Sequence, residues 1–155
     1  MNIFVLDSDP ILAAQYQCDL HINKMLIESC QLLCSAYPAG VAPYRLTHKK
    51  HPCTLWVNQS ISNWNWLLTH AVGLADEFVF RYEHHHKSIS VVNWLYKHRP
   101  TLSNAVISAF PQCMPDSYKS EDVVQAYRNY YISEKRAFAK WQKSREKPFW
   151  WPYEH

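Results

Sequence analysis

A helix-length stretch of the chain carries polar and aromatic residues at a strict interval of seven. The recurring residues are Trp56, Asn63, His70 and Glu77, with Trp66 and Arg81 on the same side. Residues seven apart in an α-helix are separated by about two turns and lie on nearly one face. Another face of this stretch is apolar, with Val57, Ile61, Trp64, Leu68, Ala71, Val72 and Ala75. The pattern predicts one long helix from about residue 53 to residue 82, with a polar stripe beside its apolar face.

Start and stop signals predict helices elsewhere in the chain. Pro10, which follows a Ser-Asp pair, starts a helix that runs to about residue 36, where Tyr37 precedes a proline. Ser120, followed by two acidic residues, starts a last long helix that runs to about Lys143. The remaining expected elements are short: an apolar segment over residues 2–6, either a lone strand or extended chain in the core, and helices over 88–97 and 101–110.

The scarcity of glycine indicates the same fold class. Only two glycines occur in 155 residues, and no Asn-Gly or Asp-Gly pair marks a β-hairpin. A chain of this length is expected to form one domain and to bury a core without disulfides. We therefore predict an all-α fold, a single compact domain over residues 1–155. It has about five helices, three of them long, and a short extended N-terminal segment.

Charge and cysteine content suggest the cellular setting. The net charge of +3 permits contact with nucleic acid without demanding it, and the C-terminal end is locally basic. No stretch reaches the roughly 18 uncharged apolar residues of a membrane span, and the N-terminus lacks the features of a signal peptide. The five cysteines lie mostly within apolar helical patterns. We expect a reduced, cytoplasmic protein with free thiols, in an infected host cell if the chain is viral.

The predicted first long helix carries a group of residues suited to catalysis. Gln17, His21, Lys24 and Glu28 follow one another at spacings of four, three and four, and Asp19 lies near them. An imidazole, an amine and a carboxylate on one helix face can transfer protons or attack an electrophilic carbon. The alternative is a solvated face with an ordinary Lys–Glu ion pair one turn apart. We take His21, Lys24, Asp19 and Glu28 as candidate catalytic residues.

The stripe on the second long helix suits a nucleobase. Asn63 can form paired hydrogen bonds to a base edge, and tryptophan can stack on a base. Solvent-facing helix surfaces rarely carry two tryptophans, although the Glu–Arg pair at i,i+4 is also explained as a structural ion pair. The candidate binding residues here are His51, Trp56, Asn63, Trp66, His70, Glu77 and Arg81. Facing the first stripe, they would enclose a polar, aromatic-lined cleft.

The last long helix combines aromatic and basic residues. Arg128 and Lys135 lie seven apart on one face and are candidate phosphate contacts, with Tyr127 and Tyr131 beside them. The alternative is a core stripe of tyrosines flanked by solvated cations. The aromatic tail over residues 148–153 is open to two interpretations, a nucleic-acid contact or an apolar lid on the core.

Metal binding and thiol chemistry have weaker support. Cys18 with His21, Cys30 with Cys34, and the run of three histidines at 84–86 have spacings compatible with metal ligation. A zinc site, however, usually shows two close ligand pairs with Cys-x-x-Cys-like loops. The thiols best placed for reactivity are Cys53, beside His51, and Cys113. We expect no metal and no cofactor.

The order of these motifs is similar to that in known families. The opening Asp-Pro, followed by Cys18, Asp19, His21, Lys24 and Met25, is similar to small phage proteins. More distantly, the chain resembles the phage pyrimidine-dimer DNA glycosylase family of the endonuclease V type. Three pieces carry this resemblance: the run 12–16 leading to Lys24-Met25, His51 opening a helix that ends in Glu77 and Arg81, and the tail 147–151 after the last helix.

That resemblance implies a compact helical fold and a glycosylase coupled to a lyase. In the family the N-terminal amine attacks the sugar C1′ and forms an imine, a glutamate of the first helix assists, and an extrahelical base is accommodated. Near the position of that glutamate this sequence has Asp19, His21 and Ile22, and Asn2 is expected to leave Met1 in place.

The sequence thus predicts a phage-type DNA glycosylase-like protein acting on damaged or modified pyrimidines. Two alternatives stay open: a non-enzymatic protein that sequesters a nucleotide in the same cleft, and an enzyme that acts on free nucleotides. The expected partner is DNA or a nucleotide and not a membrane. Exposed aromatic residues of the tail leave a homodimer open.

Overall fold

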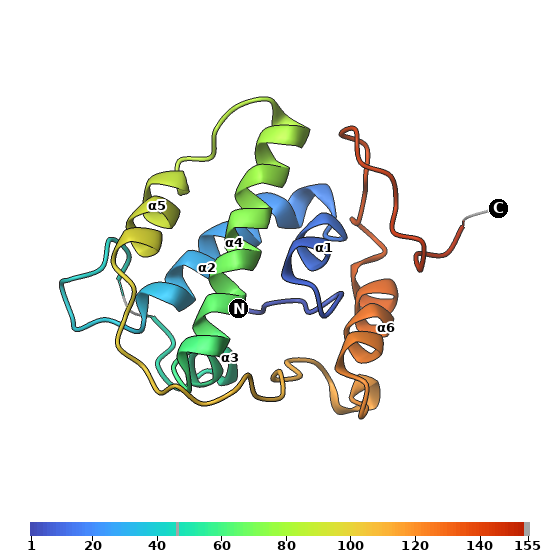
Figure 1. Ribbon diagram of the computed structural model, residues 1–155. Helices are drawn as coiled ribbons and strands as arrows, with labels where there is room; N and C mark the ends of the chain where they lie inside the picture. The colour runs from blue at the N-terminus through green and yellow to red at the C-terminus, as the bar shows by residue number, and fades with distance from the viewer. Residues whose placement is uncertain (46, 154–155) are drawn as a thin grey trace.

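The computed structural model describes residues 1–45 and 47–153, and all regular secondary structure within them is helical (Figure 1). This confirms the predicted all-α fold. The elements are α1 (Pro10–Gln15), α2 (Asp19–Cys34), α3 (Pro52–Val57), α4 (Ile61–Tyr82), α5 (Ile89–Lys97), a 3-10 turn η1 (Asp116–Tyr118) and α6 (Val123–Lys135).

Helix α4 is the centre of the structure and contacts α1, α2, α3 and α5. It begins at Ile61, after Ser60, whose side chain caps it by accepting a hydrogen bond from the Asn63 amide. Its end at Tyr82 is the predicted one, whereas its start lies later than the predicted residue 53. Gly73 lets α1 approach closely, because a Cβ there would lie 3.1 Å from the Ala14 Cβ. Helix α1 and the N-terminal segment lie between α4 and α6 (Figure 1).

The predicted first long helix is interrupted between α1 and α2. Asp9 caps α1 as expected, since its carboxylate accepts from the amides of Ile11 and Leu12. The chain then leaves the helix at residues 16–18, where tertiary partners replace the missing intrahelical hydrogen bonds. The Cys18 amide donates to the Tyr131 hydroxyl at 2.9 Å. These partners lie far away in the sequence, so local periodicity could not reveal the break.

The predicted second long helix is likewise two helices, α3 and α4. His51 caps α3, its Nδ1 accepting from the Cys53 amide at 3.1 Å, and Pro52 occupies the first turn. Ser60 ends the interruption by capping α4. Trp56 and Asn63 therefore lie on different helices, although the Asn63 side-chain amide still donates to the Trp56 carbonyl at 2.8 Å.

The predicted helix over residues 101–110 is wrong, and the last helix is shorter than predicted. Residues 101–110 form non-helical chain because α4 uses their polar groups: the Ile61 amide donates to the Ser103 carbonyl, and the Ser108 amide donates to Asn63 Oδ1. Helix α6 begins after Asp122 instead of Ser120 and ends at Lys135. The chain after it turns back, and the Asp19 amide donates to the Lys140 carbonyl at 2.8 Å.

The segment 2–6 is extended chain within the core, one of the two alternatives expected. Ile3, Val5 and Leu6 are almost fully buried. Asn2 shapes the segment, because its side-chain oxygen accepts from the amides of Ile3 and Phe4. Phe4 has a φ of 55°, in the left-handed region that a bulky residue rarely adopts.

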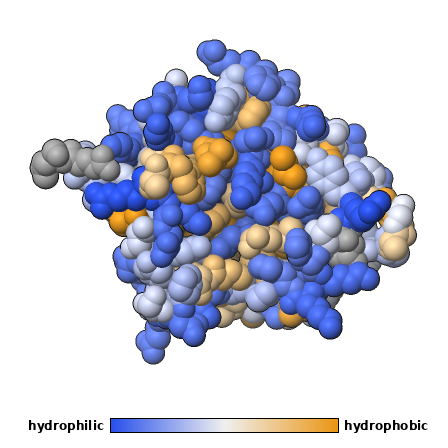
Figure 2. Space-filling model, turned by 180° about the vertical axis from the view of Figure 1, so that it is seen from behind, coloured by the Kyte–Doolittle hydropathy of each residue, from blue (hydrophilic) through white to orange (hydrophobic). Residues whose placement is uncertain are grey.

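The helices agree with the expectation of no membrane span. None of the helices in the described ranges has the length and apolar character needed to cross a bilayer. On the face seen in Figure 2, hydrophobic residues form separate patches among hydrophilic ones. The homodimer stays a prediction.

Candidate functional site

A polar pocket lies beside the first residue of the chain. It has a volume of about 320 Å³ and is formed by the N-terminal segment, α2, the start of α3, the chain before η1, and α6. Its lining residues are Met1, Asn2, Phe4, His21, Lys24, Met25, Glu28, His51, Cys113, Tyr130 and Lys135. The structure therefore brings His21, Lys24 and Glu28 together with His51 and Lys135.

The Met1 amine and the Glu28 carboxylate form the centre of this pocket. The amine nitrogen lies 3.5 Å from Glu28 Oε1, and both side chains are largely buried. The second carboxylate oxygen, Oε2, is buried and has no hydrogen-bond partner among the described residues. A buried carboxylate oxygen normally has a partner, so this atom is suited to receive a hydrogen bond from a bound molecule.

His21 is held as a neutral imidazole at the wall of the pocket. The Tyr131 hydroxyl accepts from the Cys18 amide, so its own hydrogen points to His21 Nδ1, 2.8 Å away. We assign the ring hydrogen to Nε2 on this basis. Burial, and then the charges of Lys135 and Lys24, lower the pKa of His21 to about 3. The residue is thus a hydrogen-bond donor rather than a cation at neutral pH.

His51 and the two lysines complete the ring of polar groups. Burial, followed by the charges of the N-terminal amine and His48, lowers the pKa of His51. Lys24 is exposed, and Lys135 is half-buried with its ammonium 5.0 Å from the centre of the Tyr130 ring. Two cations at the pocket favour an anionic ligand such as a phosphate.

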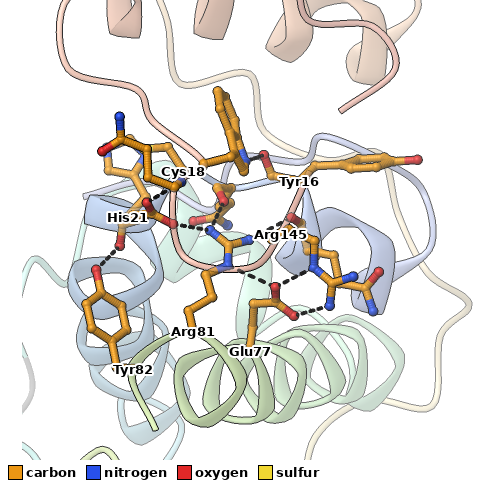
Figure 3. A network of polar contacts seen from close by, with 12 residues as sticks. Tyr16, Cys18, His21, Glu77, Arg81, Tyr82 and Arg145 are labelled. Carbon is orange, nitrogen blue, oxygen red and sulfur yellow. Dashed lines mark hydrogen bonds and ion pairs between the residues drawn. The ribbon is translucent and has the colours of Figure 1, made fainter. Parts of the chain in front are cut away.

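The structure places Asp19, Glu77 and Arg81 away from this pocket, in a buried ion network (Figure 3). Arg81 donates from Nε to Glu77 Oε1 at 2.9 Å and from Nη1 to Asp19 Oδ1 at 3.1 Å. The same guanidinium donates to the carbonyls of Gln15 and Gln17. Every charged group of the network thus has a protein partner, and the network holds the break between α1 and α2 against α4.

Sequence reasoning missed Arg145 as a member of this network. Its guanidinium donates to both oxygens of Glu77, at 2.7 and 2.9 Å (Figure 3). The Asp19 carboxylate in turn accepts from the Gln142 amide at 2.9 Å. The C-terminal chain is therefore attached to α4 and α2 by ionic hydrogen bonds. No local spacing signals such a contact, because 68 residues separate Arg145 from Glu77.

The rest of the α4 stripe is also in the core, so the expectation that it lines an open cleft is wrong. Trp56, Asn63, Trp66 and His70 are all at most 8% exposed. His70 donates from Nδ1 to the Pro10 carbonyl and accepts at Nε2 from Gln17, and burial lowers its pKa to about 4. The residues of this stripe are polar because their side chains form hydrogen bonds with other segments of the same chain.

Tyr127, Arg128 and Tyr131 also have partners within the protein. Arg128 donates to the Leu6 carbonyl and pairs with Asp7 at 3.1 Å. Tyr127 and Tyr131 are fully buried, which favours the core-stripe alternative for the tyrosines. Trp151 is buried against Tyr131, so at this residue the tail forms a lid on the core. Of the α6 candidates, Lys135 is the one that lines the pocket.

Two thiols lie next to the candidate site. Cys53 Sγ and Cys113 Sγ are 3.5 Å apart, and together with His51 they form a group whose ligand atoms lie within 4.8 Å of one another. This is the group in the described part of the chain that could hold a metal ion. His51 Nδ1, however, already accepts a hydrogen bond from the Cys53 amide.

A larger pocket, of about 410 Å³, lies at the far end of α2 around Tyr37 and Tyr44. No carboxylate is among its described lining residues, and it contains neither histidine nor a chain terminus. The smaller pocket at Met1 is therefore the better candidate for catalysis, because it combines an amine, a carboxylate and two imidazoles. Comparison with protein families, curated proteins and solved structures found no match to this chain.

Proposed function

We propose that this protein is a DNA glycosylase that acts on damaged or modified pyrimidines through an imine formed with an amine of the pocket. The observation that carries the proposal is the Met1 amine, 3.5 Å from Glu28 in a pocket with two imidazoles and two lysines. Glu28 supplies the carboxylate that the glycosylase resemblance implies, two helical turns beyond the position expected from the sequence. The order of the motifs supports pyrimidine damage as the substrate class.

Each of these residues has a distinct role in the proposed reaction. Glu28 accepts a proton from the amine, whose nitrogen then attacks C1′ of the deoxyribose while the bond from C1′ to the base breaks. The base departs with the bonding electrons and takes up a proton. The nitrogen then loses a second proton, its lone pair forms the C=N bond as the C1′–O4′ bond breaks, and the released O4′ takes up a proton. This leaves a protonated C=N link between protein and DNA. His21 donates a hydrogen bond from Nε2 to the sugar or to the departing base.

The size and charge of the site suit one extrahelical nucleotide. A volume of about 320 Å³ is at the lower end for small-ligand sites. Lys24 and Lys135 line the pocket and would contact the flanking phosphates. We place this activity in the cytoplasm, where free thiols stay reduced.

Borohydride trapping tests the proposal directly. The full chain is incubated with ultraviolet-irradiated duplex DNA and borohydride, after intact mass has established that it begins at Met1. We expect a covalent protein–DNA adduct, and peptide mapping should place it on residue 1. Lys24→Arg should keep the adduct, whereas an N-terminal extension of two residues should abolish it.

Other results would change the assignment in defined ways. An adduct on Lys24 would keep the glycosylase and overturn the choice of nucleophile. Absence of an adduct with folded protein would overturn the proposal. Stoichiometric binding of a free nucleotide without product would then support the sequestering alternative, and its turnover would support an enzyme of free nucleotides.

A further inference from the structure

Cys53 and Cys113 approach each other from distant parts of the chain. Cys53 lies in the first turn of α3, and Cys113 lies in the chain before η1, 60 residues later. Their sulfur atoms are 3.5 Å apart, and a disulfide would require an approach of about 1.5 Å. Both thiols are free. The pair is therefore in direct contact without being bonded.

The two thiols differ in access. Cys113 is partly exposed and lines the pocket at Met1, whereas Cys53 is fully buried behind it. A small reagent that enters the pocket meets Cys113 first. This arrangement matches an attacking thiol and a resolving thiol.

The surroundings of Cys113 favour its thiolate. The Cys53 thiol hydrogen-bonds to it, and the N-terminal ammonium and Lys119 contribute positive charge. Against the opposing effect of burial, these groups lower the pKa of Cys113 to about 7. The same contact, together with burial, raises the pKa of Cys53. Cys113 is thus the nucleophile of the pair.

A metal site at the same place is less well supported. His51 Nδ1 accepts from the Cys53 amide, and the pKa of His51 also reflects a hydrogen bond to the Met1 backbone. A cation there would have to displace one of these contacts and would lie near the N-terminal ammonium. That charge favours a thiolate and disfavours an incoming metal ion.

We propose that Cys113 and Cys53 form a reversible oxidation site, in which a hydroperoxide converts the pair to a disulfide and a cellular thiol reduces it. The proposal does not depend on the glycosylase activity, because the modification is measured on the protein itself. The oxidant is a hydroperoxide small enough to enter the pocket.

The chemistry has two balanced steps. The Cys113 thiolate attacks one oxygen of hydrogen peroxide, the O–O bond breaks, and the released hydroxide takes a proton to give water, leaving Cys113 as a sulfenic acid. The Cys53 sulfur then attacks the Cys113 sulfur and loses its proton, and the S–O bond breaks to release a second water. The two thiols have lost two electrons, and one peroxide has become two waters.

The disulfide would connect three walls of the pocket. The Cys113 carbonyl accepts from the Asn2 side chain at 2.8 Å, and the Cys113 amide donates to the Tyr127 hydroxyl at 3.1 Å. Drawing Cys113 toward α3 therefore moves a residue that is attached both to the N-terminal segment and to α6. Oxidation is expected to change the shape of the pocket around the Met1 amine.

Mass spectrometry tests the proposal. Reduced full-length protein is treated with equimolar hydrogen peroxide at pH 7, denatured, alkylated and digested. We expect the number of alkylated thiols to fall from five to three, with a linked peptide pair containing Cys53 and Cys113. We expect Cys113 to react about threefold faster than a cysteine of the unfolded chain, since its higher thiolate fraction outweighs its lower nucleophilicity. Dithiothreitol should restore all five thiols.

Matched variants separate this pair from the other cysteines. Cys53→Ser should stop the reaction at a Cys113 sulfenic acid that dimedone captures, and Cys34→Ser should leave the Cys53–Cys113 disulfide unchanged. Circular dichroism establishes that each variant is folded. Retention of five thiols, linkage to any other cysteine, or stoichiometric zinc that shields Cys53 and Cys113 in the purified protein would each overturn the proposal.

Discussion

At the scale of single residues, the histidines show how burial determines chemistry. His21 and His70 are both inside the protein, and each has hydrogen-bond partners that accommodate a neutral ring. Burial lowers their pKa values to about 3 and about 4 respectively. Of these two residues, only His21 reaches the pocket. The neutral imidazole is therefore available for catalysis in His21, whereas in His70 it serves packing.

These two pKa values predict a loss of stability in mild acid. Each value is lower in the folded than in the unfolded chain, so the unfolded state binds more protons below about pH 6.5. Stability should therefore decrease as the pH falls from 7 to 5, by about 2 kcal/mol for each histidine. Urea unfolding at both values measures it, and His70→Gln should reduce the difference. An equal difference in wild type and variant would contradict the assignment.

Replacement of Glu28 should lower the rate of the proposed reaction while leaving the folding of the protein largely unchanged. Its charged partner in the described structure is the Met1 amine, and its side chain is 17% exposed. Glu28→Gln should therefore reduce the rate of adduct formation by about 100-fold, the usual scale for a lost general base, with little change in stability. The rate is read from borohydride trapping over time. Glu121→Gln, at an exposed position, should behave as wild type.

At the scale of elements, helix breaks are held by side chains from elsewhere in the chain. The chain between α1 and α2 lacks intrahelical partners for the carbonyls of Gln15 and Gln17, and Arg81 of α4 supplies donors to both. At the break between α3 and α4, Ser60 caps α4 and the Asn63 side chain donates to the Trp56 carbonyl. A cap is visible in the sequence, whereas a donor from a distant helix is not.

Arg81→Met should reveal the contribution of this network to the packing of α1 and α2 on α4. The substitution leaves the buried carboxylates of Asp19 and Glu77 without their shared cation, although Glu77 keeps Arg145. We expect a loss of about 3–5 kcal/mol in the free energy of unfolding, typical for breaking a buried ion pair. Denaturant unfolding measures it. Arg99→Met, which removes an exposed arginine, should cost less than about 1 kcal/mol.

At the scale of the whole molecule, the C-terminal chain completes the core. Trp151 packs against Tyr131 and Trp141, and Arg145 binds Glu77, so residues after α6 contact both the core and α4. The tail thus contributes to the stability of the region that supports His21, because Tyr131 also bonds to that imidazole.

Two tail substitutions should distinguish this packing role from a surface role. Trp151 is 4% exposed and Phe149 is 74% exposed. Trp151→Ala should cost about 3–5 kcal/mol of stability, as for other buried tryptophans, and Phe149→Ala should cost less than about 1 kcal/mol. Thermal unfolding of both variants measures the difference. Equal effects would mean that the tail does not complete the core as described.

The sequence by itself determined the fold class and many helix boundaries. Scarce glycine, apolar periodicity and the cap at Asp9 are local properties, and they act over one or two turns. Periodicity also indicated that His21, Lys24 and Glu28 share a face, which the pocket confirms.

Only the tertiary structure decided which polar residues face a ligand and which face the protein. Glu28 and Glu77 are both carboxylates on helical stripes, yet Glu28 meets the Met1 amine in an open pocket and Glu77 is buried between two arginines. Met1 lies 27 residues from Glu28, and Arg145 lies 68 residues from Glu77, so no helical periodicity in the sequence indicates these partners. A buried polar group forms hydrogen bonds with the groups that the fold places beside it. Which groups those are depends on the fold of the whole chain.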